Sequence, residues 1–204
     1  MRTFSIAAVC IINLLIGLRY VWLIRRGTIH PSLAMWVFFT IAVIGSLLTY
    51  LSEGSYGMLD NVLNSADLLL CGGVALAIVI WGDRSSRFNR FDLGCLGGVG
   101  LIIAVWAMTR QHGIAHLAIQ LILVITYFPV VKRLWQSDRN TESFSMWIGL
   151  MLAPMFSLLS SKGALATVYA VRAIICTALL LALMTRVELR ARKGIAHEHA
   201  SGER

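Results

Sequence analysis

Charge is scarce in this chain of 204 residues, because only 14% of them are Asp, Glu, Lys or Arg while 58% are hydrophobic. This low charge content, with a mean hydropathy of +0.76, excludes a disordered chain and almost any soluble globular enzyme. The composition indicates an integral membrane protein. A helical span takes about 20 apolar residues, so the length allows seven spans but no additional soluble domain.

Recognisable reactive motifs are also missing. The four cysteines all lie in apolar runs without a Cys-x-x-Cys pair, which excludes a disulfide-rich scaffold. The chain has no nucleophile elbow, Walker loop, His-Glu-x-x-His motif or pair of carboxylates placed for acid–base catalysis. The net charge of +8 comes without basic patches interleaved with aromatics. We therefore predict no enzymatic activity, no cofactor, no metal site and no nucleic-acid partner.

Seven apolar segments are present, and each is bounded by charged or turn residues. Backbone polar groups in hydrocarbon must be paired within the chain, so these segments are predicted to be transmembrane helices of a single all-α membrane domain, residues 1–204. The predicted spans are 4–24, 33–51, 59–81, 92–109, 113–131, 143–160 and 164–185.

The basic residues are distributed unevenly between the two predicted sides. One side, which includes the basic tail 186–204, holds 13 of the 18 Lys and Arg residues, while the other holds Arg2, Arg110 and Lys162. Because Lys and Arg concentrate in cytoplasmic loops, we predict that the N-terminus is outside and the C-terminus inside.

An internal repeat is visible in the sequence. Residues 32–36 (SLAMW) match residues 143–147 (SFSMW) at an offset of 111 positions, and the same offset pairs Ala42 with Ala153 and Ser46 with Ser157. An offset of 105 positions lays the third span over the seventh and pairs Asp67 with Arg172. We therefore predict that residues 4–81 and 113–185 form two three-helix repeats of the same orientation.

The fourth span, 92–109, is left over as a linker helix. Its Gly94 and Gly98 form a Gly-x-x-x-Gly pair, which permits close packing of helices in lipid. This 3+1+3 layout, together with an outside N-terminus, resembles the SWEET and PQ-loop superfamily over residues 4–185. Residues 129–132 (PVVK), Glu142-Ser143 and Trp147 resemble the junction of the fifth and sixth spans in bacterial SWEET-like proteins, although the Pro-Gln dipeptide is absent.

The resemblance implies a multi-pass protein of a bacterial cytoplasmic (inner) membrane. It also implies a transporter for a sugar-like solute that works by alternating access between the two three-helix bundles. The alternative is a non-transporting scaffold or accessory subunit with the same fold. The expected partners are the lipid bilayer, a small solute and, as an open alternative, further copies of the chain.

Two charged residues are predicted deep in the membrane. Asp67 and Arg172 each lie eight residues into their spans, about 12 Å from the outer end. Charged groups at such depth face a bundle interior or a cavity, so we expect an ion pair or one shared polar cavity. The two readings are a solute site, in which Asp67 binds ammonium and Arg172 carboxylate, and a structural tie between the repeats.

Several neighbours belong to the same predicted site. Asn64 lies one turn from Asp67, and Tyr169 is its counterpart in the repeat, so both are candidates to line the cavity. Trp36 and Trp147 occupy equivalent places near the inner ends of their spans, where we expect an interfacial or gating role. Pro154 is predicted to kink the sixth span because it lacks a backbone N–H.

His112 and His116 lie four residues apart at the outer end of the fifth span. Two histidines on one helical face have the spacing of metal ligands, but no third ligand lies near them in the sequence. We expect solvated histidines at the membrane interface.

Overall fold

The fold is described from a computed structural model, which places residues 1–29, 31, 33–82, 90–136 and 144–202. All elements in these ranges are helical. They are α1 (Arg2–Arg25), α2 (Leu33–Glu53), the 3₁₀ helix η1 (Met58–Asn61), α3 (Val62–Trp81), α4 (Arg90–Thr109), α5 (His112–Ile125), α6 (Phe128–Gln136), α7 (Phe144–Ser157) and α8 (Gly163–Gly202). Ser32 and Ser143 of the sequence repeat, and the loop positions Arg84, Arg87 and Arg139, lie outside the described residues.

Five helical segments are long and apolar enough to cross a membrane. They are Arg2–Arg25, Met35–Glu53, Met58–Trp81, His112–Gln136 and Gly163–Ala191, whereas Leu93–Thr109 and Phe144–Ser157 are shorter apolar helices. Large apolar side chains face outward, including Leu69 at 79% and Met108 at 86% exposure. Such a surface is costly in water but suits lipid, so the fold is consistent with an integral, multi-pass membrane protein.

The fifth predicted span is interrupted near its predicted inner end. Thr126 and Tyr127 form a turn between α5 and α6, and Pro129 follows in the first turn of α6. Proline has no backbone N–H to donate to the carbonyl one turn earlier, which accounts for a break at this point. The helical path nevertheless continues to Gln136, five residues beyond the predicted end at 131.

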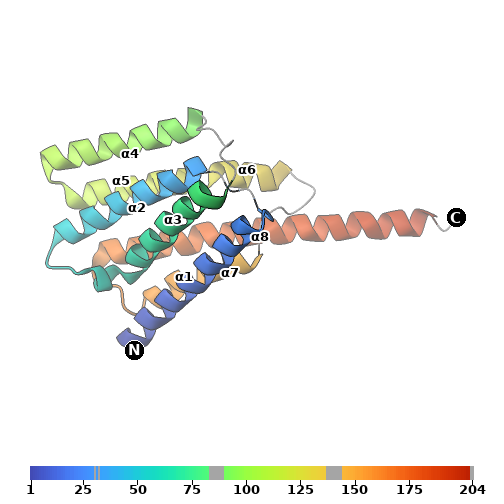
Figure 1. The fold of residues 1–204 in the computed structure, drawn as a ribbon, viewed down its shortest axis with the longest axis horizontal. Coiled ribbons are helices and arrows are strands. Elements are labelled where there is room, and N and C mark those ends of the chain that lie inside the picture. Colours follow the sequence, from blue (N-terminus) through green and yellow to red (C-terminus); the bar gives the residue numbers. More distant parts are fainter. Residues whose placement is uncertain (30, 32, 83–89, 137–143, 203–204) are drawn as a thin grey trace.

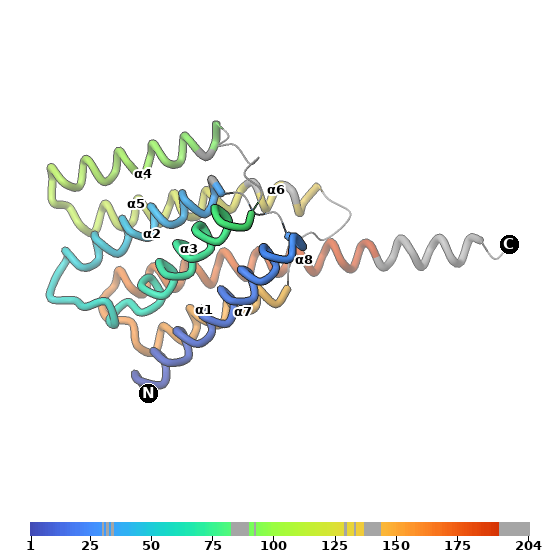
Figure 2. The backbone as a smooth tube through the Cα atoms, in the orientation of Figure 1, coloured from blue at the N-terminus to red at the C-terminus, as the bar shows by residue number. Residues whose placement is uncertain are grey.

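Apart from α6, which continues the path of α5, successive α-helices run in opposite directions, as Figure 1 and Figure 2 show. The N-terminus and the links α2–α3, α4–α5 and α7–α8 lie at one end of the bundle, which we call the N-terminal end. The α1–α2 link lies at the opposite end, and α8 runs toward that end as well.

We divide the helices on either side of α4 into two groups, α1–α3 and α5–α8. In the first group α3 contacts both α1 and α2, and in the second α8 contacts α5, α6 and α7. The groups meet where α1 packs against α7 and where α2 packs against α5, while α4 covers the α2–α5 junction. At this cover Gly98 is close to α5, because a Cβ there would lie 3.1 Å from Ile122 Cδ1, whereas Gly94 has open space around it.

The main apolar core crosses both groups. Its fully buried members include Val9 of α1, Ala42 of α2, Ile119 of α5, Ala153 of α7 and Ala170 of α8. Alanines at these crossings let helix backbones approach closely, which is how helices associate in the absence of a hydrophobic driving force.

Candidate functional site

Three of the four predicted solute-site residues meet between α3 and α8. The Tyr169 hydroxyl of α8 donates a hydrogen bond of 2.9 Å to Asp67 Oδ2 of α3. The Arg172 guanidinium, one turn further along α8, lies 4.8 Å from the centre of the Tyr169 ring. We call Asp67, Tyr169 and Arg172 the central polar group.

The link between the two charges is indirect. Both residues lie in described segments, and the structure records no ion pair between them. Arg172 Nε is buried without a hydrogen-bond partner, and Tyr169, only 1% exposed, lies between acid and base. A buried donor without an acceptor costs free energy, so a bound acceptor would be stabilised at this point.

Asn64 faces a different set of partners. Its side chain is fully buried and points toward α2. In the amide orientation that gives partners to both the nitrogen and the oxygen, the nitrogen donates to Val43 O at 3.2 Å. In that orientation its oxygen accepts from Leu47 N at 3.2 Å and from Ser46 Oγ at 2.9 Å. Asn64 therefore fastens α3 to α2, and among the described residues no hydrogen bond joins its side chain to Asp67, Tyr169 or Arg172.

Ser46 connects Asn64 to two residues of α5 that the sequence analysis did not assign to a site. Gln120 Nε2 donates to Ser46 Oγ at 2.9 Å and lies 3.3 Å from His116 Nε2. His116 Nδ1 lies 3.1 Å from Ser46 O and 3.2 Å from Thr49 Oγ1. We call these five residues, Ser46, Thr49, Asn64, His116 and Gln120, the polar junction.

These contacts agree with one histidine tautomer. If the His116 proton is on Nδ1, it donates to the carbonyl of Ser46, and the bare Nε2 accepts from Gln120. The expectation of a solvated histidine at position 116 is wrong, because its side chain is fully buried between α2 and α5. His112 instead accepts a hydrogen bond of 2.6 Å from Trp106 Nε1 across the α4–α5 turn. The polar spacing of His116 and Gln120 within an apolar span was the signal available in the sequence.

The two predicted gating tryptophans belong to one series of aromatic contacts. Trp36 contacts Phe39 on α2 with 6.4 Å between ring centres, Phe39 contacts Tyr127 at 6.2 Å, and Tyr127 contacts Trp147 of α7 at 6.1 Å. We call Trp36, Phe39, Tyr127 and Trp147 the aromatic row. The row joins both helix groups at the level of the α5–α6 turn.

A group of ions joins the helix groups at the N-terminal end. Asp60 of η1 pairs with Arg2 of α1 and, at 2.9 Å, with Lys162 of the α7–α8 link. The backbone N–H of Lys162 donates to Asp60 O at 2.9 Å, and the Tyr50 hydroxyl donates to Lys162 O at 2.9 Å. We call Arg2, Asp60 and Lys162 the ionic clasp.

Pro154 lies inside α7 and is buried, and α7 ends three residues later at Ser157. The Ser157 hydroxyl donates to Pro154 O at 2.8 Å, and Leu158 N donates to the same carbonyl at 3.2 Å. Pro154 therefore lies in the last turn of a helix of 14 residues, which ends before the predicted limit at 160. The kink itself stays a prediction.

Two surface hollows are present away from the central polar group. One, of about 540 Å³, is lined by Ala182, Thr185, Arg186, Leu189 and Arg190 of α8. The other, of about 300 Å³, lies between α4 and α5. Neither is lined by Asp67, Tyr169 or Arg172.

No metal-binding cluster of three or more His, Cys, Asp or Glu side chains occurs in the part of the chain that the structure describes. Comparison with models of protein families, with curated proteins and with solved structures finds no match for this chain.

Proposed function

We propose that this protein is a membrane transporter for a small sugar-like or zwitterionic solute, working by alternating access between two three-helix bundles. The observation that carries the proposal is the central polar group. The acid, Asp67, lies on α3, and the base, Arg172, lies on α8. The buried Tyr169 contacts both, and Arg172 Nε has no hydrogen-bond partner. Ionisable groups within membrane helices most often mark solute or ion pathways.

The packing supports a repeat of two parallel triplets joined by α4. Each triplet has its third helix in contact with the other two, and the crossings α1–α7 and α5–α2 exchange under the offset of 111. Polar contacts obey the same exchange. Ser5 Oγ lies 2.8 Å from Ser160 Oγ at one crossing, and the equivalent residues His116 and Thr49 lie 3.2 Å apart at the other.

A zwitterion fits the chemistry of the central polar group. Asp67 offers a carboxylate to an ammonium group, and Arg172 offers a planar donor fork to a carboxylate. Tyr169 now occupies the space between them. A solute that displaced the Tyr169 hydroxyl would pair both charges at once, which repays part of the cost of burying them.

Contacts at two levels would close the solute path in the observed conformation. The ionic clasp and the Ser5–Ser160 contact join the triplets at the N-terminal end, and the aromatic row joins them at the level of the α5–α6 turn. Rocking of one triplet against the other would break one set while keeping the other. Trp36 and Trp147 then serve as gating residues, and Pro154 lies in the last turn of a helix that moves.

The second candidate is a non-transporting scaffold in a bacterial inner membrane, in which the central polar group only ties the triplets together. The observation that favours it is the burial of Tyr169, which is 1% exposed and lies between Asp67 and Arg172. Uptake of radiolabelled sugars and amino acids into proteoliposomes separates the two. The transporter accumulates at least one solute faster than empty liposomes do, whereas the scaffold shows no uptake above empty liposomes for any of them.

A further inference from the structure

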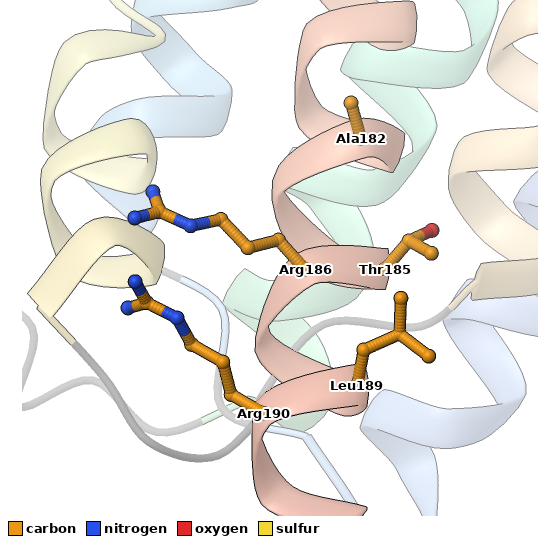
Figure 3. Close-up of a pocket in the computed structure, with 5 residues that line it drawn as sticks. All are labelled: Ala182, Thr185, Arg186, Leu189 and Arg190. Atoms are coloured by element: carbon orange, nitrogen blue, oxygen red, sulfur yellow. The ribbon is translucent and has the colours of Figure 1, made fainter. Parts of the chain in front are cut away.

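The hollow of about 540 Å³ on α8 lies where the apolar part of that helix ends. The segment apolar enough to cross a membrane is Gly163–Ala191, and the hollow occupies the last turns of it, Ala182 to Arg190. Its five lining residues recur at helical spacing and so form one face of α8. Figure 3 shows this face with both arginine side chains reaching toward the neighbouring helix α6.

One of the two arginines that line the hollow packs against α6. The guanidinium of Arg186 lies 3.9 Å from the ring centre of Trp135, which fixes a side chain that would otherwise be free. Arg190 follows one turn later and is exposed. The acidic residue of this region, Glu188, is two positions from each arginine and so projects from a different face of the helix.

The other side of the hollow is apolar. Ala182 and Leu189 line it, and Leu189 is 54% exposed. Trp135 is itself 59% exposed, as expected of an aromatic residue at a membrane–water boundary. Two positive charges, one of them held against Trp135, beside an exposed apolar wall match an amphipathic anion, not a free inorganic one.

We propose that this hollow binds an anionic phospholipid, whose phosphate lies between Arg186 and Arg190 and whose acyl chain follows Ala182 and Leu189. Guanidinium groups pair with phosphate through two parallel hydrogen bonds, and basic pockets between membrane helices suit acidic headgroups. The inference requires only that the protein lies in a membrane, and it holds whether or not the protein transports a solute.

Native mass spectrometry of the purified full chain in detergent tests the proposal with two lipids of equal chain length. Dioleoyl phosphatidylglycerol should bind more tightly than dioleoyl phosphatidylcholine. The double variant Arg186→Gln/Arg190→Gln should bind phosphatidylglycerol roughly 10- to 30-fold more weakly, because each arginine near a lipid surface contributes about 1 kcal/mol. Added inorganic phosphate should not displace the lipid, since it lacks the acyl chain.

The matched control is Arg25→Gln/Arg26→Gln, which removes two adjacent arginines at the same end of the bundle. Arg26 lies over Trp22 at 4.0 Å, much as Arg186 lies over Trp135. This control should retain binding within about twofold of the native chain. The variant Ala182→Phe, which keeps both arginines but places a bulky ring on the wall that the acyl chain would follow, should weaken binding as well. Equal binding of the two lipids, equal losses in the two double variants, or full binding by Ala182→Phe would each overturn the proposal.

Discussion

Tyr169 is the residue on which the central polar group depends, because it contacts both Asp67 of α3 and Arg172 of α8. It keeps the two opposite charges apart while contacting both. In a direct ion pair the Asp67 carboxylate would occupy the guanidinium of Arg172. With Tyr169 between the two charges, Arg172 Nε stays available to a ligand.

Tyr169→Phe should therefore lower the stability of the folded protein by about 1–3 kcal/mol, because Asp67 loses its buried donor. Thermal unfolding of the two proteins in the same detergent measures the difference. Tyr56→Phe is the control, since its ring stacks on Tyr50 and its hydroxyl has no hydrogen bond within the described part of the chain. An unfolding temperature for Tyr169→Phe as high as that of the control would contradict the assigned role.

The sequence offset of 111 supplies a second comparison, between Ser46 and Ser157. Ser46 Oγ joins Asn64 to Gln120, whereas among the described residues Ser157 Oγ bonds only within its own helix, to Pro154 O. We expect Ser46→Ala to cost about 1–3 kcal/mol and Ser157→Ala less than about 1 kcal/mol. Chemical denaturation of each variant gives both free energies of unfolding. Similar losses for the two variants would show that the hydrogen bonds of Ser46 in the polar junction stabilise the fold no more than that of Ser157.

At the scale of helices, the sequence indicated which helices meet better than it indicated side-chain direction. The offset of 105 pairs Asp67 with Arg172, and in the structure both contact Tyr169. Asn64 was assigned to the same cavity because it lies one turn from Asp67, but three residues on a helix differ by about 60° in direction. That rotation turns Asn64 toward α2, and only the packing of α2 against α3 decides which face it meets.

The break between α5 and α6 has a similar explanation. Pro129 could be read in the sequence, yet the apolar run 113–131 continues through it, and hydrophobicity alone does not register a missing N–H. His116 was misjudged because a position near a span end suggests water, whereas α4 and α2 cover that part of α5.

The crossing of α1 and α7 should be open in one state and closed in the other. In a chain whose four native cysteines are replaced, Ser5→Cys/Ser160→Cys should form a disulfide on mild oxidation, because the two oxygens lie 2.8 Å apart. The bridge should stop solute uptake, and a reductant should restore it. Each single cysteine variant is the control, and continued uptake by the oxidised double variant would show that this crossing does not move.

For the whole molecule, the distribution of positive charge sets the predicted orientation. Lys162 belongs to the N-terminal end of the bundle, and exposed Lys132 lies on α6 near the other end. In intact bacterial cells, a membrane-impermeant thiol reagent should label Lys162→Cys directly but label Lys132→Cys only after permeabilisation. The background again lacks the native cysteines. The reverse pattern would invert the topology, and labelling of both in intact cells would contradict an odd number of spans between them.

For the whole molecule, burying the charges of Asp67 and Arg172 costs free energy, and a function of these charges would explain why they are present. A scaffold gains little from charges that apolar residues of similar volume could replace. In a transporter the two charges would bind the solute in one conformation and release it when the bundles rock.

The most direct test of this claim is initial uptake into proteoliposomes by Asp67→Asn, using a solute that the native protein transports. Asp67→Asn keeps the size of the side chain and an acceptor for Tyr169 but removes the charge. The control is Glu53→Gln, which makes the corresponding change at an exposed carboxylate at the end of α2. We expect uptake by Asp67→Asn to fall at least tenfold, to near the level of empty liposomes, while Glu53→Gln transports at the native rate. Uptake at the native rate by correctly folded Asp67→Asn would contradict a role of this charge in transport.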